Sequence, residues 1–313
     1  KYNRYYSQVQ AGEWNTPSYF YLLAGKQSSY YSSALDAMRK MDAVVQAFGN
    51  KLGDYPFLLE KHGYYDGLVG ASGMEHQTFS GMASNALTSL VTLDHELMHQ
   101  WFGDNVTFGT WNDLWLAEGF ARYGELLAAE LVPSLGYDPY IRRNNRKNAA
   151  LSLNSTSLWI PDAGIANSGT IWNSNYGSAV YERGCMVVSM LRTICGDEKF
   201  FNALRNYQTV LRGKSASTDS LKRFFNEQLQ TDITEFFLDY VGGSGNAAIS
   251  AGGKGNPIYE IKWNSPEQKK LVLGVLSQSP TGSSNVEYFN GPVVVRAVGS
   301  NLGEDTTIVF YDN

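Results

Sequence analysis

The spacing of apolar and polar residues predicts several helices in the first 241 residues of the chain. Residues 34–48, ALDAMRKMDAVVQAF, place their apolar side chains on one helical face. Residues 64–80, YYDGLVGASGMEHQTFS, are typical of a strand, a turn and a second strand. A further helical pattern runs from about Ala86 to Phe102, and Ser84 or Asn85 is its expected N-cap.

The helical pattern continues beyond residue 110. One helix is expected to begin near Asn112 or Asp113. Later helical segments are predicted at 179–194, 197–211, 217–229 and 232–241. The last two begin with Ser217 and Asp232, residue types that cap helices well. Cys185 and Cys195 lie ten residues apart in this helical region, so a helix separates them by about 15 Å. That separation is too long for a disulfide, and we expect two buried thiols.

The pattern changes after residue 241. Residues 242–256 are dominated by glycine and small side chains, which indicates a linker. Alternating, β-branched runs follow and predict strands, at 258–263, 269–276, 291–298 and 306–311. We therefore expect an α+β protein with a main domain at 1–241, a linker at 242–256 and a small all-β domain at 257–313.

Composition narrows the class of protein. The chain has 313 residues, of which 43% are hydrophobic and 18% charged, as in globular proteins. The net charge of −5 argues against nucleic acid as a partner, and no apolar run is long enough for a transmembrane helix. Because the chain begins with Lys1 and shows no signal peptide, we expect a processed or truncated piece. Its richness in Tyr, Asn, Ser and Gly favours a soluble, secreted or periplasmic protein.

Residues 95–104, HELMHQWFGD, carry two of the four histidines in the chain. On a helix, positions i and i+4 share a face, so His95 and His99 can bind one metal ion. Neutral imidazoles are good zinc ligands. Glu96 is offset by one position, where a general base for a zinc-activated water is needed. The spacing H-E-x-x-H predicts this chemistry, although it also occurs by chance.

Two ligands do not complete a catalytic zinc site, which has three protein ligands and an open position. The remaining histidines are His62 and His76, and we expect neither to bind the metal. A carboxylate on the next predicted helix is the better candidate. Glu118, in WNDLWLAEGFARYGE, follows His99 after eighteen intervening residues that include the turn needed to reverse direction. His95, His99 and Glu118 are therefore the predicted ligands of one Zn2+ per chain.

Three motifs in this order resemble the gluzincin aminopeptidases of the alanyl-aminopeptidase and leukotriene-hydrolase type. GMEHQTF is similar to their Gly-x-Met-Glu-Asn motif, and HELMHQWFGD followed by WLAEGFARYGE is similar to their zinc motif. VYERGCMVVSML resembles their Tyr-Glu-Lys-Gly helix. The resemblance implies a thermolysin-like catalytic domain with a helical lobe, followed by a β-sandwich-like domain. It also implies a zinc aminopeptidase that acts on peptides with a free N-terminus.

The resemblance assigns roles to individual residues. Glu96 would be the general base, and Tyr181 would stabilise the oxyanion of the tetrahedral intermediate. Glu75 would bind the α-ammonium group of the substrate. Met74 and Gly73 would place backbone groups along the substrate, and Tyr176 matches a pocket tyrosine of some relatives. Glu125 is a candidate partner for a histidine ligand.

The sequence departs from the family pattern at several points. Ser72 replaces the first glycine of the exopeptidase motif, His76 replaces its asparagine, and Arg183 stands where lysine is usual. Relatives also carry an N-terminal β domain that often contributes to binding the substrate's amino group. Because this chain begins close to the catalytic domain, we expect that domain to be missing, which makes the aminopeptidase preference less secure than zinc hydrolysis.

Two alternatives remain open. The first is a thermolysin-like zinc endopeptidase, against which Glu75 within GMEH argues. The second is an inactive peptide-binding module on a peptidase fold. Such modules usually lose the base or a ligand, whereas Glu96, all three candidate ligands and Tyr181 are present here.

Overall fold

The computed structural model describes residues 1–11, 14–153, 155–242, 254–267, 270–281, 286, 289, 291–297 and 306–311. Its N-terminal part contains a mixed sheet with the strand order β1-β2-β3-β5-β4. These strands are Tyr2–Ala11 (β1), Trp14–Leu23 (β2), His62–Asp66 (β3), Gly73–Met74 (β4) and Ser80–Met82 (β5). β2, β3 and β5 are parallel to one another, while β1 and β4 run antiparallel at the two edges. The sequence analysis made no prediction for the β1–β2 hairpin.

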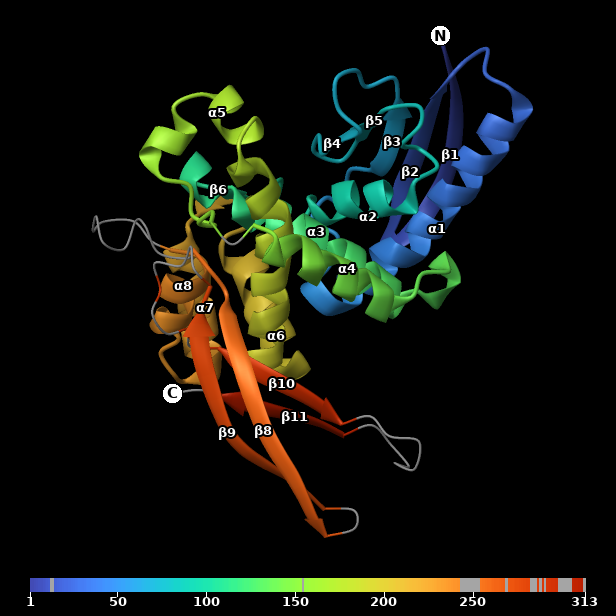
Figure 1. Cartoon of the computed structure of the whole chain (residues 1–313). Helices are drawn as coiled ribbons and strands as arrows, with labels where there is room; N and C mark the ends of the chain where they lie inside the picture. Colours follow the sequence, from blue (N-terminus) through green and yellow to red (C-terminus); the bar gives the residue numbers. More distant parts are fainter. Residues whose placement is uncertain are drawn as a thin grey trace.

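Helix α1 (Ser28–Leu52) lies along the sheet and confirms the helix predicted at 34–48 (Figure 1). Its apolar stripe, from Ala34 through Met38, Met41 and Val45 to Phe48, is buried. A side chain every three or four positions therefore packs into the core, as the periodicity requires. The observed helix is longer than predicted at both ends because its terminal turns carry few apolar residues.

Helix α2 (Leu90–Met98) starts later than predicted, and its N-cap is Ser89, not Ser84 or Asn85. The Ser89 side chain accepts a hydrogen bond from the Thr92 amide. Ser84 lies six positions before the first residue of α2, and its hydroxyl donates to Asp66 Oδ1 at 2.6 Å. A strand β6 (Val106–Phe108) and a short 3-10 turn (Trp111–Asp113) then lead into α3 (Trp115–Leu131).

The remaining elements of this region are helical apart from one short strand. They are Pro139–Leu151 (α4), Ser168–Trp172 (α5), Asn175–Val210 (α6), Lys214–Ala216 (β7), Thr218–Leu229 (α7) and Thr234–Tyr240 (α8). α6 unites the two helices predicted at 179–194 and 197–211, with a break at Gly196, whose φ is 70°. Ser217 caps α7 as predicted, whereas α8 begins at Thr234, whose amide donates to Asp232 Oδ1.

The two cysteines confirm only part of the prediction for them. Both are free thiols, as their spacing required. Cys185 is buried, but Cys195 is only partly buried because it lies next to the break in α6 at Gly196. Neither residue links distant parts of the chain.

Four C-terminal strands confirm the β character predicted beyond residue 257. They are Pro257–Glu267 (β8), Lys270–Pro280 (β9), Pro292–Ala297 (β10) and Thr306–Tyr311 (β11). β8 pairs with β9 and β10 with β11, both antiparallel. The linker predicted at 242–256 lies mostly outside the described residues. Within the described part of the chain, no helix has the length and apolar character needed to cross a bilayer.

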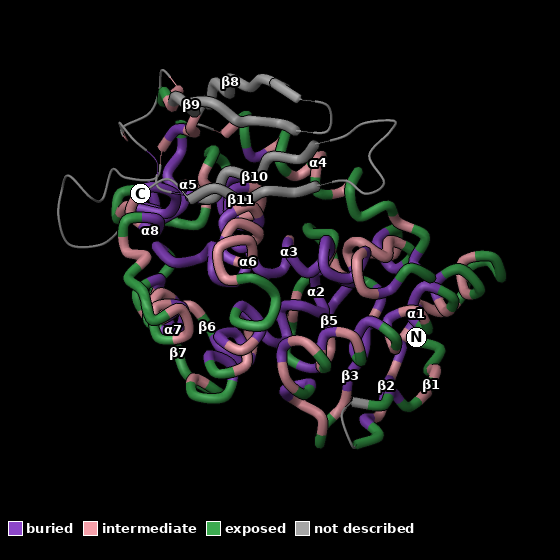
Figure 2. Tube along the Cα trace, turned by 90° about the horizontal axis from the view of Figure 1, so that it is seen from below, coloured by how far each residue is buried: buried purple, intermediate pink, exposed green. Residues whose placement is uncertain are grey.

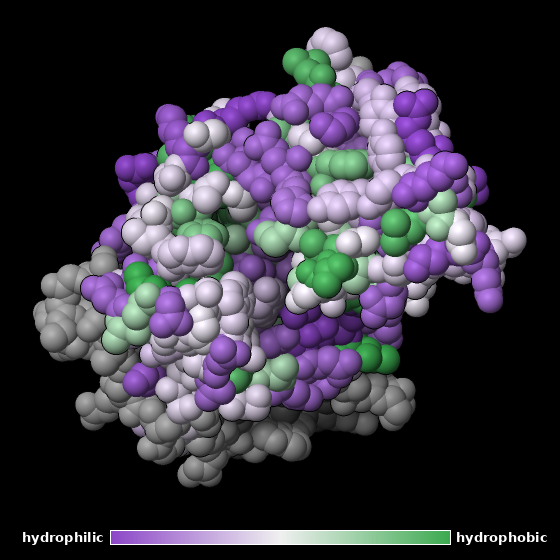
Figure 3. Space-filling view, turned by 90° about the horizontal axis from the view of Figure 1, so that it is seen from above, coloured by the Kyte–Doolittle hydropathy of each residue, from purple (hydrophilic) through white to green (hydrophobic). Residues whose placement is uncertain are grey.

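The hydrophobic core extends across the helices that join the sheet to the helical region. Figure 1 shows the sheet and α1 on one side, α6 to α8 on the other, and α2 and α3 between them. Buried residues follow α2 and α3 through the centre (Figure 2). Trp101 and Trp115, which are fully buried, flank the segment between these helices. Apolar side chains on the face seen in Figure 3 are interspersed with polar ones. Because α2 and α3 are packed in the core on several sides, the side chains that they carry start from firmly positioned backbones.

Candidate metal centre

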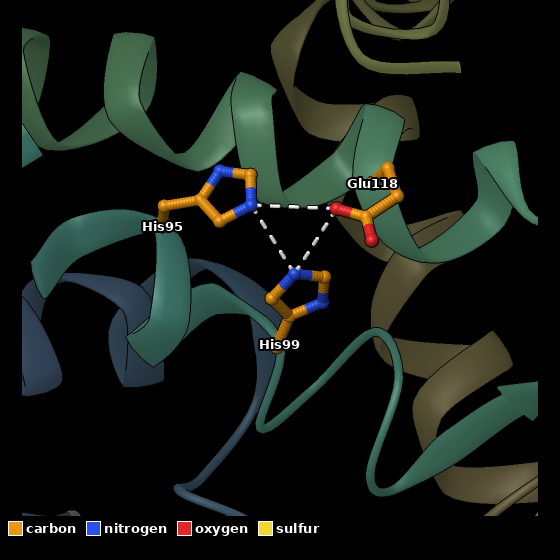
Figure 4. A group of neighbouring side chains, drawn as sticks. All are labelled: His95, His99 and Glu118. Carbon is orange, nitrogen blue, oxygen red and sulfur yellow. Dashed lines mark hydrogen bonds and ion pairs between the residues drawn. The ribbon is translucent and has the colours of Figure 1, made fainter. Parts of the chain in front are cut away.

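Three side chains converge between α2 and α3 (Figure 4). His95 lies in the last turn of α2, His99 is its C-cap, and Glu118 lies in the first turn of α3. His95 Nε2 and His99 Nε2 are 3.3 Å apart, and Glu118 Oε2 is 3.4 Å from each of them. A tetrahedral zinc ion with ligand bonds of about 2.0–2.1 Å separates its ligand atoms by about 3.3–3.4 Å. The triangle therefore has the dimensions of a zinc site.

The second nitrogen of each histidine is occupied. His95 Nδ1 lies 3.1 Å from Glu125 Oε1, and His99 Nδ1 lies 3.1 Å from the Phe102 carbonyl oxygen. Both Nδ1 atoms face acceptors, so each N–H donates there and each Nε2 keeps its lone pair for the centre. Glu118 Oε2 is buried and has no hydrogen-bond partner among the described residues. Three acceptor atoms facing one another in a buried site require a cation, and the donor set suits zinc.

The electrostatics of the site also favour positive charge. Burial opposes protonation of both histidines, but the Glu118 carboxylate raises the pKa of His99 to about 10, and Glu118 and Glu125 raise that of His95. Burial likewise opposes the charge of Glu118, yet the two histidines hold its pKa below the ordinary value. The pocket thus stabilises a cation at the centre of the triangle, which is the role a metal ion fills.

Glycines allow the helices to approach closely enough to form the site. A Cβ atom on Gly119 would lie 2.9 Å from backbone atoms of Gly184, and one on Gly184 would lie 2.8 Å from Gly119 Cα. α3 and α6 therefore cross with their backbones in contact. On another side of α3, a Cβ on Gly124 would lie 2.6 Å from Met98 Cβ. The sequence analysis missed these contacts, although each α3 glycine stands next to a site carboxylate, Glu118 or Glu125.

Glu96 is 5% exposed and lies beside the metal triangle. Its carboxylate fills the space that a side chain on Gly73 would occupy, which explains a glycine at that position of β4. Burial raises the pKa of Glu96 to about 7; the nearby Glu75 and Glu118 carboxylates add to the rise, and the two histidines oppose it. A carboxylate with a pKa near neutrality can both accept and return a proton.

The segment after β4 brings Glu75 to the same place. A carboxylate oxygen of Glu75, a carboxylate oxygen of Glu96 and a ring nitrogen of His99 lie within 4.8 Å of one another. Gln100 fixes this segment, because its side chain donates to the Glu75 carbonyl at 3.4 Å and accepts from the Thr78 amide at 2.7 Å. The sequence analysis did not single out Gln100, whose partners in this segment, Glu75 and Thr78, are more than twenty residues away in the chain.

Other residues of the predicted exopeptidase motif lie in different surroundings. His76 faces Tyr65, with Nδ1 at 3.3 Å from the phenol oxygen, and is not part of the metal triangle. Met74 is 38% exposed at the edge strand β4. Gly73 is packed against Glu96.

Tyr181 of α6 lies next to the triangle. Its ring centroid is 5.6 Å from that of His95, and the two ring planes differ by 26°. Burial and the nearby Glu118 carboxylate raise its pKa above the ordinary value, so its hydroxyl stays protonated and is a hydrogen-bond donor. Tyr176, in contrast, lies in the first turn of α6 and packs near Gly164. Among the described residues, no hydrogen bond, ion pair or ring contact joins Tyr176 to the triangle.

A network of four charged side chains supports the site from behind. Glu125 Oε1 contacts Arg122 Nη1 at 2.7 Å, and its Oε2 lies 3.4 Å from Arg146 Nη2. Glu182 Oε1 lies 3.4 Å from Arg122 Nε and 2.9 Å from Arg146 Nη1. Burial opposes the charge of Glu125, but its contacts with His95, Arg122 and Arg146 keep its pKa low. The network therefore holds an ionised acceptor against His95.

Comparisons with known proteins agree with these motifs. A profile of the peptidase family M1 domain matches residues 74–240. Endoplasmic reticulum aminopeptidase 2 of Homo sapiens is 33% identical over 154 residues, 49% of this chain and 16% of that protein. Leucyl aminopeptidase of Saccharolobus solfataricus is 29% identical over 221 residues, 70% of this chain and 27% of that protein.

A solved structure gives the same picture. The M1 zinc metallopeptidase of Deinococcus radiodurans matches 73% of this chain and 49% of its own, with 27% identity and a TM-score of 0.60. The chain thus spans only part of the length of each relative it matches.

Proposed function

Because the chain belongs to the peptidase M1 family, we propose that it forms the catalytic part of a zinc aminopeptidase that removes residues from the free N-termini of peptides. The observation that carries this proposal is the buried triangle of His95, His99 and Glu118, whose edges of 3.3–3.4 Å fit one tetrahedral zinc ion. Curated relatives named as aminopeptidases support the reaction class.

His95, His99 and Glu118 would hold a zinc ion, which when bound would supply Lewis-acid activation of water and of the scissile carbonyl. Glu96 accepts a proton from the attacking water and returns it to the departing amine. The protonated hydroxyl of Tyr181 donates a hydrogen bond to the developing oxyanion.

Glu75 gives the site its preference for free N-termini in this proposal. A carboxylate oxygen of Glu75 lies within 4.8 Å of a Glu96 carboxylate oxygen and a His99 ring nitrogen, so Glu75 stands beside the residues that would carry out the reaction. An α-ammonium group entering this buried region needs a paired negative charge, which Glu75 provides. A blocked N-terminus lacks that charge and leaves Glu75 unpaired.

The proposal also covers the arrangement of the chain. We assign residues 1–241 to a thermolysin-like catalytic domain with a helical lobe, 242–256 to a linker and 257–313 to a β domain. The mixed sheet followed by helices α2 to α8, and the strands β8 to β11, support this division.

The test is hydrolysis of a panel of aminoacyl fluorogenic amides, each with a free or an acetylated amine, before and after chelation. We expect chelator-sensitive cleavage of the free-amine substrates alone. Cleavage of internal bonds in blocked peptides would instead identify an endopeptidase. Stoichiometric zinc without hydrolysis of any substrate would overturn the assignment of activity to this chain alone and leave a missing domain or an inactive module on a peptidase fold as the explanation.

A further inference from the structure

We propose that Arg122 is a positioning residue that holds the ring of Tyr181 in its catalytic place. The inference rests on the proposed function, in which the Tyr181 hydroxyl stabilises the oxyanion. Arg122 follows Glu118 by four positions on α3 and precedes Glu125 by three. The three residues therefore form one stripe along a single helix face. This stripe carries a candidate zinc ligand, a cation and the acceptor of His95.

The guanidinium of Arg122 is fixed on two sides by carboxylates. Nη1 contacts Glu125 Oε1 at 2.7 Å, and Nε lies 3.4 Å from Glu182 Oε1. The side chain is only 22% exposed. The contact with Glu125 is a hydrogen bond, whereas the longer one with Glu182 is an ion pair in which Nε makes no hydrogen bond to the described residues. Because the guanidinium is planar, the two contacts together restrict its position and its tilt.

The same guanidinium lies over Tyr181. Its Cζ atom is 5.1 Å from the centroid of the phenol ring, within the range of a cation–π contact. Glu182, which follows Tyr181 directly in α6, forms an ion pair with Arg122 and a hydrogen bond with Arg146. Arg122 therefore contacts α6 at two adjacent residues, Tyr181 and Glu182. In this proposal these contacts hold the Tyr181 ring beside the metal triangle.

Arg146 of α4 provides a matched control. It contacts the same two carboxylates, Glu125 at 3.4 Å and Glu182 at 2.9 Å. Among the described contacts, however, none joins Arg146 to the Tyr181 ring. If Arg122 acts only through the charge network, replacing either arginine should have similar effects. If Arg122 acts through Tyr181, its replacement should have an effect that replacement of Arg146 lacks.

The experiment compares Arg122→Met with Arg146→Met in the full chain, each with the native Tyr181 and with Tyr181→Phe. We measure kcat, KM and zinc content on a free-amine substrate. We expect Arg122→Met to lower kcat about tenfold, equivalent to about 1.4 kcal/mol, with KM nearly unchanged and with no more loss of zinc than Arg146→Met shows. The loss for Arg146→Met should be clearly smaller. In the Tyr181→Phe background, Arg122→Met should cause no further loss, because its action passes through the missing hydroxyl.

Equal losses for the two arginines, or a full additional loss in the Tyr181→Phe background, would overturn the proposal. Arg122→Lys serves if the methionine variant does not fold: it keeps the charge but not the planar stack, so it should restore zinc content and stability without restoring kcat. A crystal structure of zinc-loaded Arg122→Met gives a test that needs no activity. An unchanged single position of the Tyr181 ring would refute the positioning role even if the native protein hydrolysed no peptide.

Discussion

The crossing of α3 and α6 predicts that Gly184→Ala harms both stability and catalysis. A Cβ on Gly184 would lie 2.8 Å from Gly119 Cα, so the helices must separate by several tenths of an ångström. Overpacking of this kind costs about 1–3 kcal/mol, while replacing glycine in a helix returns about 1 kcal/mol of helix propensity. The net loss of unfolding free energy is therefore expected to be about 0–2 kcal/mol.

A second substitution separates the two contributions. Gly49 lies in α1, and a Cβ there meets nothing within 4 Å. Gly49→Ala should therefore gain the helix propensity without the clash and raise the unfolding free energy by about 0.5–1 kcal/mol. The difference between the two variants in urea unfolding measures the cost of the crossing, which we expect to be about 1–3 kcal/mol.

Catalysis should suffer more than stability. Gly184 stands three residues after Tyr181, and Gly119 stands directly after Glu118. Separating their helices therefore moves the oxyanion donor away from the metal triangle. Because a misplacement of about 1 Å can cost about 100-fold in rate, we expect kcat of Gly184→Ala to fall about 10- to 100-fold while Gly49→Ala keeps the native value. If Gly184→Ala matched Gly49→Ala in unfolding free energy and kcat, the close crossing would not exist.

Three further predictions concern single side chains. Burial lowers the pKa of His62 from 6.5 to about 4, so the native state disfavours protonation of this residue. The contribution of neutral His62 to the unfolding free energy is therefore fully present above pH 6.5, and about 3 kcal/mol of it is lost as the pH falls to 4. Urea unfolding of the chelator-treated native protein should show this loss of unfolding free energy, and the His62→Leu variant should lack it. The prediction would be contradicted if the unfolding free energies of the two proteins changed equally with pH. Glu125→Gln should weaken zinc binding about 10- to 100-fold in competition with a chromophoric chelator, because His95 loses an ionised acceptor at 3.1 Å, whereas the exposed Glu227→Gln should not. Glu96→Gln should lower kcat at least about 100-fold with full zinc content by metal analysis, and loss of the metal itself would show that Glu96 acts as a ligand.

The parts of the site that depend on local spacing were predictable from the sequence. Four-residue spacing placed His95 and His99 on one helix, and the following helix brought Glu118 to them. The stripe of α1 and the four C-terminal strands were also evident, since burial imposes periods of three to four and of two residues. These features require no knowledge of how distant segments pack.

Features that depend on distant contacts were not predictable. The start of α2 was misplaced because three capping residues, Ser84, Asn85 and Ser89, precede the apolar run, and only the folded chain shows that Ser89 accepts the Thr92 amide while Ser84 donates to Asp66 of β3. Gln100 shows no periodic signal, yet it fixes the segment that carries Glu75. Arg122, Arg146 and Glu182 look like ordinary surface charges of helices until α3, α4 and α6 are packed together. Such roles arise from tertiary structure, and the pattern of residues along a single chain does not reveal them.

Helix α3 shows why the site depends on a single segment. Three of its charged residues serve the site: Glu118 is a candidate zinc ligand, Arg122 stacks on the Tyr181 ring, and Glu125 is the acceptor of His95. Two of its glycines set the packing, since Gly119 contacts α6 and Gly124 contacts α2. The glycines determine how closely the neighbouring helices approach α3, and the contacts of the charged residues depend on that distance. Because both depend on the same backbone, a shift of α3 must change zinc binding and the position of Tyr181 together. Substitutions at Gly119 or Gly124 should therefore lower zinc affinity and kcat in parallel, whereas Arg122→Met should lower kcat beyond any effect that it shares with Arg146→Met.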